Sequence, residues 1–333
     1  MIWNINEIKI GIVGYGSWAT AIVHLIAQKG LHLDWWVKNS EDLEHIKSKY
    51  VNPRYLSSTR LSVDYINPLT DIKEVINNND YIFLITPSAY LAQTLSGIHS
   101  EDLINKNIIS SIKGLDPKSQ LLISEYFKEN FHISNNQFCV LSGPSHAEEV
   151  SQQKTTYLTS ASENETLSAQ VADIIRTPFI HTLLSDDVVG IEVVGILKNI
   201  YTIGIGIALG LGYMDNFIAA FVCACLREID LYLHKISPNH SREITHSVYL
   251  GDFLTTSYSP FSRNRKFGFL IGSGESIDEA IQNMNMVAEG YNSTKIMVEK
   301  RNLHYTIAQA VYDILFKFEE PRKIFKNIEN III

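Results

Sequence analysis

The sequence has few cysteines and no excess of positive charge, and each shortage excludes a class of protein. Its three cysteines (Cys139, Cys223 and Cys225) are an odd number without the C-x-x-C spacing of zinc sites, so we expect neither a disulfide framework nor a bound metal. The formal net charge is -8, which argues against nucleic-acid or anionic-membrane partners, because these need a basic surface. A negatively charged small substrate would then need a local positive pocket.

The sequence also lacks an obvious targeting or membrane segment. The first ten residues, MIWNINEIKI, contain no basic stretch followed by an apolar one, so we expect no secretory signal. The longest apolar segment, residues 193–214, carries Lys198, Asn199 and several glycines, and a lysine near the centre of a membrane span costs about 3 kcal/mol. We therefore expect a buried helix, no integral membrane segment and a cytoplasmic location.

A chain of 333 residues is long enough for about two domains, and the first half alternates apolar runs with helical segments. This alternation indicates an α/β fold with a Rossmann-like, doubly wound parallel sheet. A helix is expected over residues 17–29, where apolar side chains recur at helical spacing. The expected strands are residues 9–14, 31–37, 81–86, 107–112 and 138–142, with outer strands at 155–161 and 179–185.

From about residue 187 the pattern is helical throughout. Two segments, Ser276–Glu279 and Thr306–Gln309, fit a capping box, in which a hydroxyl residue is followed three residues later by Glu or Gln. We expect a Rossmann-like dinucleotide-binding domain over residues 1–188 and an all-α substrate and catalytic domain over residues 189–333.

The stretch GIVGYGSWAT, residues 11–20, has the position of a dinucleotide loop, between the first strand and the first helix. Gly14 permits the tight turn, and Gly16 lets the backbone approach a pyrophosphate. The third position needs only a small residue for packing, so Ala19 serves there in place of glycine. The helix N-terminus would supply N–H groups to the phosphates. The alternative is a plain tight turn.

No carboxylate follows the second strand, where a ribose-reading acid is expected. The residues there are Lys38 and Asn39, and Asp34 lies too early, inside the strand. A cation at this position suits a 2′-phosphate, which favours NADP over NAD, although a merely solvated lysine explains Lys38 nearly as well.

Three further stretches follow strands, at the edge where open α/β sheets bind ligands. Pro87 lies in TPS, and Lys113 lies in SIKGL, where a surface lysine is the more ordinary interpretation. In SGPSHAEEV, Ser145 and Glu148 fit another capping box, which explains the stretch without a catalytic role for His146.

Charged residues in the second half suggest catalysis. Lys198 lies in an apolar helix, so it is either paired or functional, or it reaches water from the helix edge. Burial would lower its pKa and suit it to proton exchange near neutrality. In GDFLTTSYSPFSRNRKFG, Arg263 and Asn264 could clamp a phosphate or carboxylate and Asp252 could hold an ammonium group, although RNRK alone also fits a solvated loop.

Taken in order, these stretches resemble bacterial-type NAD(P)-dependent glycerol-3-phosphate dehydrogenase. The matching blocks are GYGSWATA, TPS, SIKGL, SGPSHAEEV, GILKNI, GYMDN, GDFLTTSYSPFSRNRKFG and AEGY, and they run from residue 9 to about residue 292. The resemblance implies reversible reduction of dihydroxyacetone phosphate to sn-glycerol 3-phosphate for glycerophospholipid synthesis, with NADP or NAD as cofactor. It also implies a homodimer.

The resemblance carries residue roles onto matching positions. It implies that Lys198 is the general acid/base, that Arg263 and Asn264 hold the substrate phosphate, and that Lys113 and Asp252 complete the catalytic set. The implied substrate-binding residues are Lys113, Gly143, Ser145, Asn199, Asp252, Thr256, Ser262, Arg263 and Asn264. The implied cofactor-binding residues are Gly14, Gly16, Ser17, Trp18, Lys38, Pro87, Lys113, Ala147, Arg263, Val287 and Glu289.

The chain departs from the family pattern at several positions. Cys223, Ala224 and Cys225 replace the usual Thr-Arg-Gly, which puts any role of that arginine in doubt, and Met214 replaces a glycine. Two other functions stay open. One is a different two-domain, lysine-dependent reductase of the hydroxyacid or ketopantoate type, which would not need the Ser-Arg-Asn loop at 262–264. The other is a non-catalytic dinucleotide sensor, which would need neither Lys113 nor Lys198.

Overall fold

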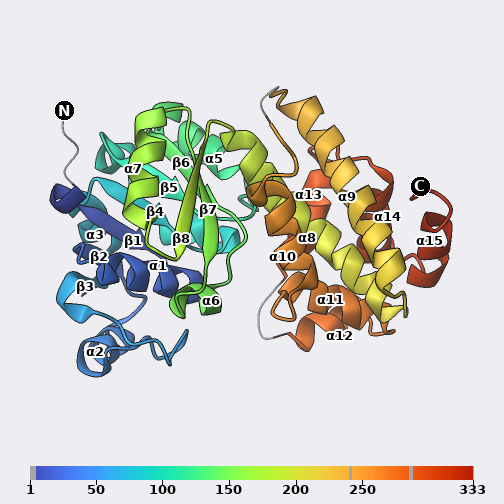
Figure 1. The fold of residues 1–333 in the computed structure, drawn as a ribbon, viewed down its shortest axis with the longest axis horizontal. Coiled ribbons are helices and arrows are strands. Elements are labelled where there is room, and N and C mark those ends of the chain that lie inside the picture. The colour runs from blue at the N-terminus through green and yellow to red at the C-terminus, as the bar shows by residue number, and fades with distance from the viewer. Residues whose placement is uncertain (1–4, 240–241, 285–287, 333) are drawn as a thin grey trace. The chain divides into compact units, whose positions relative to one another are not determined.

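A computed structural model describes residues 5–239, 242–284 and 288–332 of the chain. The chain forms two compact units (Figure 1). The first unit contains Met1–Ile112 and Leu121–Ile191, and the second contains Lys113–Gln120 and Glu192–Ile333. The short segment 113–120 thus belongs to the second unit, although it follows a strand of the first.

The first unit is built on an eight-stranded sheet with the order β3-β2-β1-β4-β5-β6-β7-β8. All neighbouring strands are parallel except β6 and β7. The predicted α/β Rossmann-like class is confirmed. The strands are β1 (Ile10–Val13), β2 (Leu33–Trp36), β3 (Ile66–Leu69), β4 (Tyr81–Leu84), β5 (Asn107–Ser110), β6 (Phe138–Ser142), β7 (Thr156–Ala161) and β8 (Ile180–Ser185).

Strand β3 is absent from the seven strands that we predicted. It has four residues, one of them Pro68, and it pairs only with β2 at the edge of the sheet. Proline cannot donate to a strand ladder and is tolerated at such an edge. A short run that contains proline therefore gives little strand signal in the sequence.

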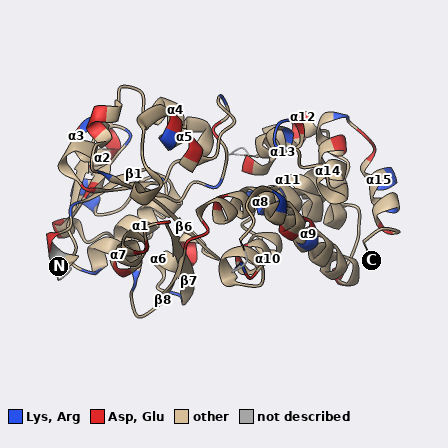
Figure 2. Ribbon diagram, turned by 90° about the horizontal axis from the view of Figure 1, so that it is seen from above, with Lys and Arg blue, Asp and Glu red and all other residues tan. Residues whose placement is uncertain are grey.

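Helices cover both faces of the sheet. On one side α1 contacts α6 and α7, while α3 and α5 lie on the other side (Figure 2). The four residues of β1 and of β4 are all buried, as expected for central strands with helices on both faces. The helices are α1 (Ser17–Gln28), α2 (Ser40–Lys49), α3 (Ile72–Asn78), α4 (Leu91–Thr94), α5 (Ile123–Phe131), α6 (Ala147–Ser151) and α7 (Glu165–Ile175).

The second unit is helical, which confirms the predicted all-α half. Its longest helix is apolar enough to cross a membrane by length and composition, but 89% of its most apolar window is buried inside the protein, so it is a core helix. The helices are α8 (Val188–Gly210), α9 (Asp215–Ile236), α10 (Asp252–Tyr258), α11 (Arg263–Gly272), α12 (Ile277–Gln282), α13 (Glu289–Glu299), α14 (Thr306–Phe316) and α15 (Pro321–Ile328), and a π-helical turn (Ser247–Gly251) precedes α10.

The predicted capping boxes have different outcomes. Ser276 and Glu279 form one at the start of α12, as expected. The prediction for Thr306 is wrong, because Tyr305 is the N-cap of α14 and Thr306 is already helical. The start of α14 is capped from another helix instead: the Glu228 carboxylate of α9 accepts the N–H groups of Ile307 (2.7 Å) and Ala308 (3.2 Å). At Ser145 the expected box is also absent, since the N-cap of α6 is His146.

Helices α8 and α11 touch through their backbones. A Cβ atom added to any of four glycines would overlap main-chain atoms of the facing helix, such as the carbonyl oxygens of Ile203 and Ile207. Glycine allows this close approach because it has no side chain. The contact fixes α11 against the C-terminal part of α8. The four glycines are Gly206 and Gly210 of α8 and Gly268 and Gly272 of α11.

Candidate functional site

The loop between β1 and α1 has the shape of a pyrophosphate cradle. Gly14 has a φ of +153°, and a Cβ there would overlap the carbonyl group of Ile85, so only glycine fits. At Gly16 a Cβ would meet nothing within 4 Å, so the backbone is open to an approaching group. No side chain of the described residues caps α1 at Gly16. Ala19 is fully buried, as the packing position requires. These features fit a dinucleotide.

The strand order brings the predicted cofactor residues of the first unit to one edge of the sheet. The order reverses between β1 and β4, and ligands of open α/β sheets bind at such a switch point, beyond the carboxyl ends of the strands. Ser17 and Trp18 form the first turn of α1 there. Pro87 follows β4, and the exposed Lys38 follows β2. Val287 lies outside the described residues.

The predicted residues after β6 lie in the same unit. Gly143 has a φ of +142°, and a Cβ there would come 2.6 Å from the carbonyl oxygen of Tyr157. The Ser145 hydroxyl donates to the carbonyl oxygen of Gly143 at 3.1 Å. Ala147 is buried at the start of α6. The sharp turn at Gly143 therefore determines where Ser145 lies.

The second unit brings two lysines onto one buried carboxylate. Nζ of Lys198, on α8, donates to Oδ1 of Asp252 at 2.6 Å. Nζ of Lys113 donates to Oδ2 of the same residue at 3.1 Å. Lys198 is 3% exposed and Asp252 is 2% exposed. Asp252 thus holds an ammonium group, as the sequence suggested that it could, and the second lysine joins the contact.

This arrangement shifts the pKa values of both Lys198 and Asp252. Burial lowers the pKa of Lys198 to about 7, the Asp252 charge opposes that shift, and the Lys113 charge adds to it. For Asp252, burial alone would raise the pKa, but the Lys113 and Lys198 ammonium groups outweigh it and hold the pKa below its usual range. At neutral pH Asp252 is ionised, whereas Lys198 can give or take a proton.

Local structure explains why these groups meet. Asp252 opens α10 directly after the π-helical turn, an irregularity that is frequent at functional sites. One turn later, the Thr256 hydroxyl donates to the Asp252 carbonyl oxygen at 2.8 Å, so its oxygen can accept from Lys198 at 2.9 Å. The Asn199 amide reaches the carbonyl oxygen of Lys113 at 3.5 Å. Lys198 thus has two fixed acceptors.

The predicted phosphate clamp lies at the start of α11. Ser262 is the N-cap of this helix and accepts from the Arg265 N–H at 3.3 Å, so it has a structural task. Arg263 is exposed, whereas Asn264 is buried and its Oδ1 accepts from the Gly290 N–H at 3.0 Å. The Asn264 bond joins α11 to the start of α13, where Glu289 lies.

Glu289 adds a carboxylate to this cationic region. Burial raises its pKa, against the opposing charges of Arg263, Lys113 and Lys198. Next to it, a Cβ on Gly290 would come 2.6 Å from the Asn199 carbonyl oxygen, so the start of α13 is in close contact with α8 beside Lys198. The predicted residues of the second unit are therefore gathered around one end of the α8–α11–α13 packing.

Glu228 is a supporting residue that the sequence motifs did not predict. Its carboxylate accepts from the Tyr201 hydroxyl at 3.0 Å besides capping α14, and Tyr201 is one helical turn beyond Lys198 on α8. Burial raises the pKa of Glu228. The sequence offered one signal for it, an acidic residue within the largely apolar segment that forms α9.

Two of the positions that depart from the family pattern are cysteines of α9. The Cys223 thiol lies on the surface and the Cys225 thiol in the interior, and all three cysteines of the chain are free. Helical residues two positions apart point to different faces, so this pair is not arranged for a disulfide.

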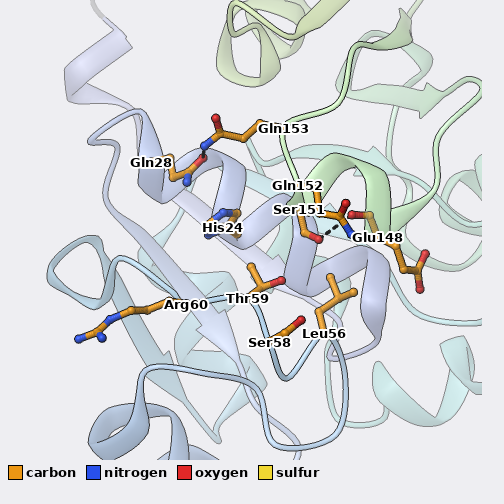
Figure 3. A pocket seen from close by; sticks show the side chains of 10 residues that line it. All are labelled: His24, Gln28, Leu56, Ser58, Thr59, Arg60, Glu148, Ser151, Gln152 and Gln153. Atoms are coloured by element: carbon orange, nitrogen blue, oxygen red, sulfur yellow. Dashed lines mark hydrogen bonds between the residues drawn. The ribbon is translucent and has the colours of Figure 1, made fainter.

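A separate cavity of about 370 Å³ lies in the first unit (Figure 3). His24, Thr59, Ser151 and Glu148 are among its lining residues, which include none of the predicted site residues. Burial lowers the pKa of His24, and its Nδ1 has no hydrogen-bond partner among the described residues. In Figure 3 the Arg60 side chain points away from the other lining residues, and its guanidinium lies 5.3 Å from the ring centroid of Tyr50. The cavity is thus distinct from the candidate site.

Comparisons with known proteins agree with these observations. Residues 9–168 match the family model for the N-terminus of NAD-dependent glycerol-3-phosphate dehydrogenase, and residues 187–326 match the model for its C-terminus. The glycerol-3-phosphate dehydrogenase [NAD(P)+] of Leptospira biflexa is 33% identical over 327 residues, which cover 96% of this chain and 97% of the relative. That of Staphylococcus carnosus is 32% identical and covers 93% and 94%.

A solved structure shows the same fold. The crystal structure of glycerol-3-phosphate dehydrogenase from Coxiella burnetii superimposes with a TM-score of 0.87 at 26% identity and covers 97% of this chain and 98% of that one. The resemblance inferred from the ordered motifs is confirmed. The chain belongs to the family of NAD(P)-dependent glycerol-3-phosphate dehydrogenases, which are oxidoreductases.

Proposed function

We propose that the chain catalyses the reversible, NAD(P)H-dependent reduction of dihydroxyacetone phosphate to sn-glycerol 3-phosphate, and so supplies glycerophospholipid synthesis. The observation that carries this proposal is the buried Asp252 carboxylate between Lys198 and Lys113, with contacts of 2.6 and 3.1 Å. Reduction of a ketone to an alcohol needs a proton donor at the carbonyl oxygen, and a buried lysine with a pKa of about 7 suits that task at neutral pH.

Lys198 is the proposed general acid and base. In the reducing direction its ammonium group gives a proton to the oxygen at C2 of the substrate, and in the oxidising direction its amine takes that proton back. Asp252 and Thr256 hold Nζ in place through contacts of 2.6 and 2.9 Å. The ammonium group is therefore already oriented before the substrate reacts, which lowers the entropic part of the barrier. Bound nicotinamide would supply or accept the hydride.

Lys113 is proposed to stabilise charge on the same oxygen. Its side chain is 24% exposed, against 4% for that of Lys198, so it is the more accessible of the two ammonium groups. A fixed positive charge beside a developing alkoxide lowers the barrier most effectively where water is excluded. Asn199 supports this lysine by its contact with the Lys113 carbonyl oxygen.

The substrate phosphate is proposed to bind at the start of α11. The exposed Arg263 presents paired N–H donors that match phosphate oxygens. The Asn264 amide group adds a donor, since among the described residues only its Oδ1 is engaged, by the Gly290 N–H. Ser262 would act mainly through its cap of α11. The substrate roles of Gly143 and Ser145 stay predictions from the resemblance. So do the cofactor roles of Gly14, Gly16, Ser17, Trp18, Lys38, Pro87, Ala147 and Glu289.

Three free cysteines support the cytoplasm as the compartment. A homodimer is the proposed assembly, and light scattering of the purified protein measures it directly.

The proposal is tested by following the oxidation of NADPH and of NADH with dihydroxyacetone phosphate. We expect turnover with at least one cofactor, and no turnover with 2-ketopantoate or 2-ketoacids, which lack the phosphate. Absence of turnover with dihydroxyacetone phosphate would contradict the proposal. Turnover with an unphosphorylated ketoacid instead would favour the ketopantoate-type alternative.

A further inference from the structure

Lys113 lies in a short excursion of the chain. The chain leaves the first unit after Ile112, forms part of the second unit over Lys113–Gln120, and returns to the first unit at Leu121. This segment, 113–120, lies between β5 and α5 and belongs to no helix or strand. The position of Lys113 therefore depends on the contacts that the segment makes within the second unit.

Two contacts hold the start of the segment. Nζ of Lys113 donates to Oδ2 of Asp252 at 3.1 Å, and the Lys113 carbonyl oxygen accepts from the Asn199 amide at 3.5 Å. The first contact uses the side chain that is also proposed to act on the substrate, and the second is long for a hydrogen bond. A contact at the other end of the segment would therefore help to fix the place of Lys113.

Arg301 makes that contact. Its Nη2 and Nε approach the Gln120 carbonyl oxygen at 3.1 and 3.4 Å. Arg301 follows the end of α13 and is half-buried, and its own carbonyl oxygen accepts from the hydroxyl group of Tyr232, which is 1% exposed, at 2.8 Å. Gln120 is thus held by a charged donor whose backbone is itself anchored to α9.

The turn between these two attachments is closed by its own hydrogen bonds. The Gln120 N–H donates to the Asp116 carbonyl oxygen at 2.8 Å. The buried Asp116 carboxylate accepts both the N–H and the hydroxyl group of Ser119, each at 2.7 Å. Only two residues, both buried, separate this closed turn from Lys113. A displacement of Gln120 would therefore be passed on to Lys113.

We propose that Arg301 is a positioning residue for Lys113. Through the Gln120 carbonyl group and the closed turn, it holds the Lys113 ammonium group beside the Asp252 carboxylate. The inference rests on the proposed function, in which this ammonium group stabilises the developing alkoxide. Loss of the Arg301 contact releases one end of the segment, so that the Lys113 charge lies farther from Lys198.

The test is the pH profile of dihydroxyacetone phosphate reduction by Arg301→Gln. Because the Lys113 charge lowers the pKa of Lys198, a displaced Lys113 should move the falling limb of kcat/KM to higher pH. Since Asp252 still holds Lys113, kcat should fall by about 10-fold, less than the roughly 100-fold that a misplacement of about 1 Å can cost.

Two variants show whether the contact or the charge matters. Arg301→Lys keeps a donor for the Gln120 carbonyl group and should restore part of the rate and part of the wild-type profile. Lys300→Ala is the matched control, because it removes an exposed cation one residue away, and it should change neither value. A limb that stays in place in Arg301→Gln, or that moves equally in Lys300→Ala, would overturn the inference.

A double-mutant cycle separates this route from one through α13. Glu289, on whose pKa the charges of Lys198 and Arg263 act, begins α13, and Arg301 follows the end of the same helix. If Arg301 acts through Lys113, Arg301→Gln should move the limb no further in a Lys113→Met background. A further shift in that background would indicate an action through α13 and would also overturn the inference.

A second variant and a second measurement keep the inference testable. If thermal unfolding shows that Arg301→Gln is not folded, Tyr232→Phe releases the Arg301 carbonyl group instead, and a limb that does not move to higher pH there would overturn the inference. Hydrogen exchange of the segment 113–120 needs no turnover, and it should be faster in Arg301→Gln but not in Lys300→Ala. A wild-type chain that does not reduce dihydroxyacetone phosphate would contradict the proposed function, whereas unchanged exchange in Arg301→Gln would contradict the inference.

Discussion

Nζ of Lys198 lies 2.6 Å from Oδ1 of Asp252, and the other oxygen of that carboxylate contacts Lys113. The two neighbours act on Lys198 in opposite ways: the Lys113 charge lowers the pKa of Lys198, and the Asp252 charge raises it. The protonation of Lys198 is therefore set by the balance between its two neighbours, in addition to its burial.

This balance predicts the pH dependence of catalysis. The reduction of dihydroxyacetone phosphate needs protonated Lys198, so kcat/KM should fall as the pH rises through about 7. Lys113→Met removes the cation that lowers this pKa, so the falling limb should move to higher pH while the rate drops. Steady-state rates between pH 5.5 and pH 9 in buffers of constant ionic strength measure both effects. A limb that stays in place in Lys113→Met would contradict the coupling.

Arg263 should act mainly on substrate capture. Arg263→Ala removes the paired donors at the start of α11, so KM for dihydroxyacetone phosphate should rise about 10- to 100-fold, with a smaller change in kcat. Inhibition by inorganic phosphate should weaken in parallel. Lys266→Ala, an exposed cation of the same helix, is the control and should alter neither value. An unchanged KM in Arg263→Ala would remove Arg263 from the phosphate site.

The close contact of α8 with α11 should make Gly268 intolerant of a side chain. A Cβ there overlaps the Ile203 carbonyl group, so Gly268→Ala should lower the free energy of unfolding by about 1 to 3 kcal/mol. Gly195→Ala is the matched control on α8, because its Cβ would meet only the Lys113 side chain at 3.7 Å. Urea unfolding measures the free energy of unfolding of both variants. If Gly268→Ala were as stable as Gly195→Ala, backbone contact would not determine the position of α11.

Much of the fold could be predicted from local patterns. Apolar runs identified seven strands, since buried parallel strands read as continuous apolar segments. The exception, β3, contains Pro68 and pairs on one side only. The buried position of Lys198 could also be predicted, because a single charge interrupts an apolar helix there.

The remaining parts of the site depend on contacts between distant residues. The segment 113–120 joins the second unit, and Lys113 reaches Asp252 across 139 residues of sequence, which no local period records. The Asp42–Arg54 pair joins a helix start to a loop, and Glu228 caps a helix about 80 residues away. Such pairings arise from tertiary packing, so neither propensity nor motif spacing indicates them.

The most direct test of the central claim is the turnover number of Lys198→Ala with dihydroxyacetone phosphate, measured at saturating NADPH beside the surface control Lys235→Ala. If Lys198 is the general acid, its loss should lower kcat by about 10²- to 10⁴-fold, while Lys235→Ala keeps the wild-type rate. Binding of adenosine 2′,5′-bisphosphate should be unchanged in both, which shows that the variants are folded. A folded Lys198→Ala protein with a kcat within a few-fold of wild type would contradict the account.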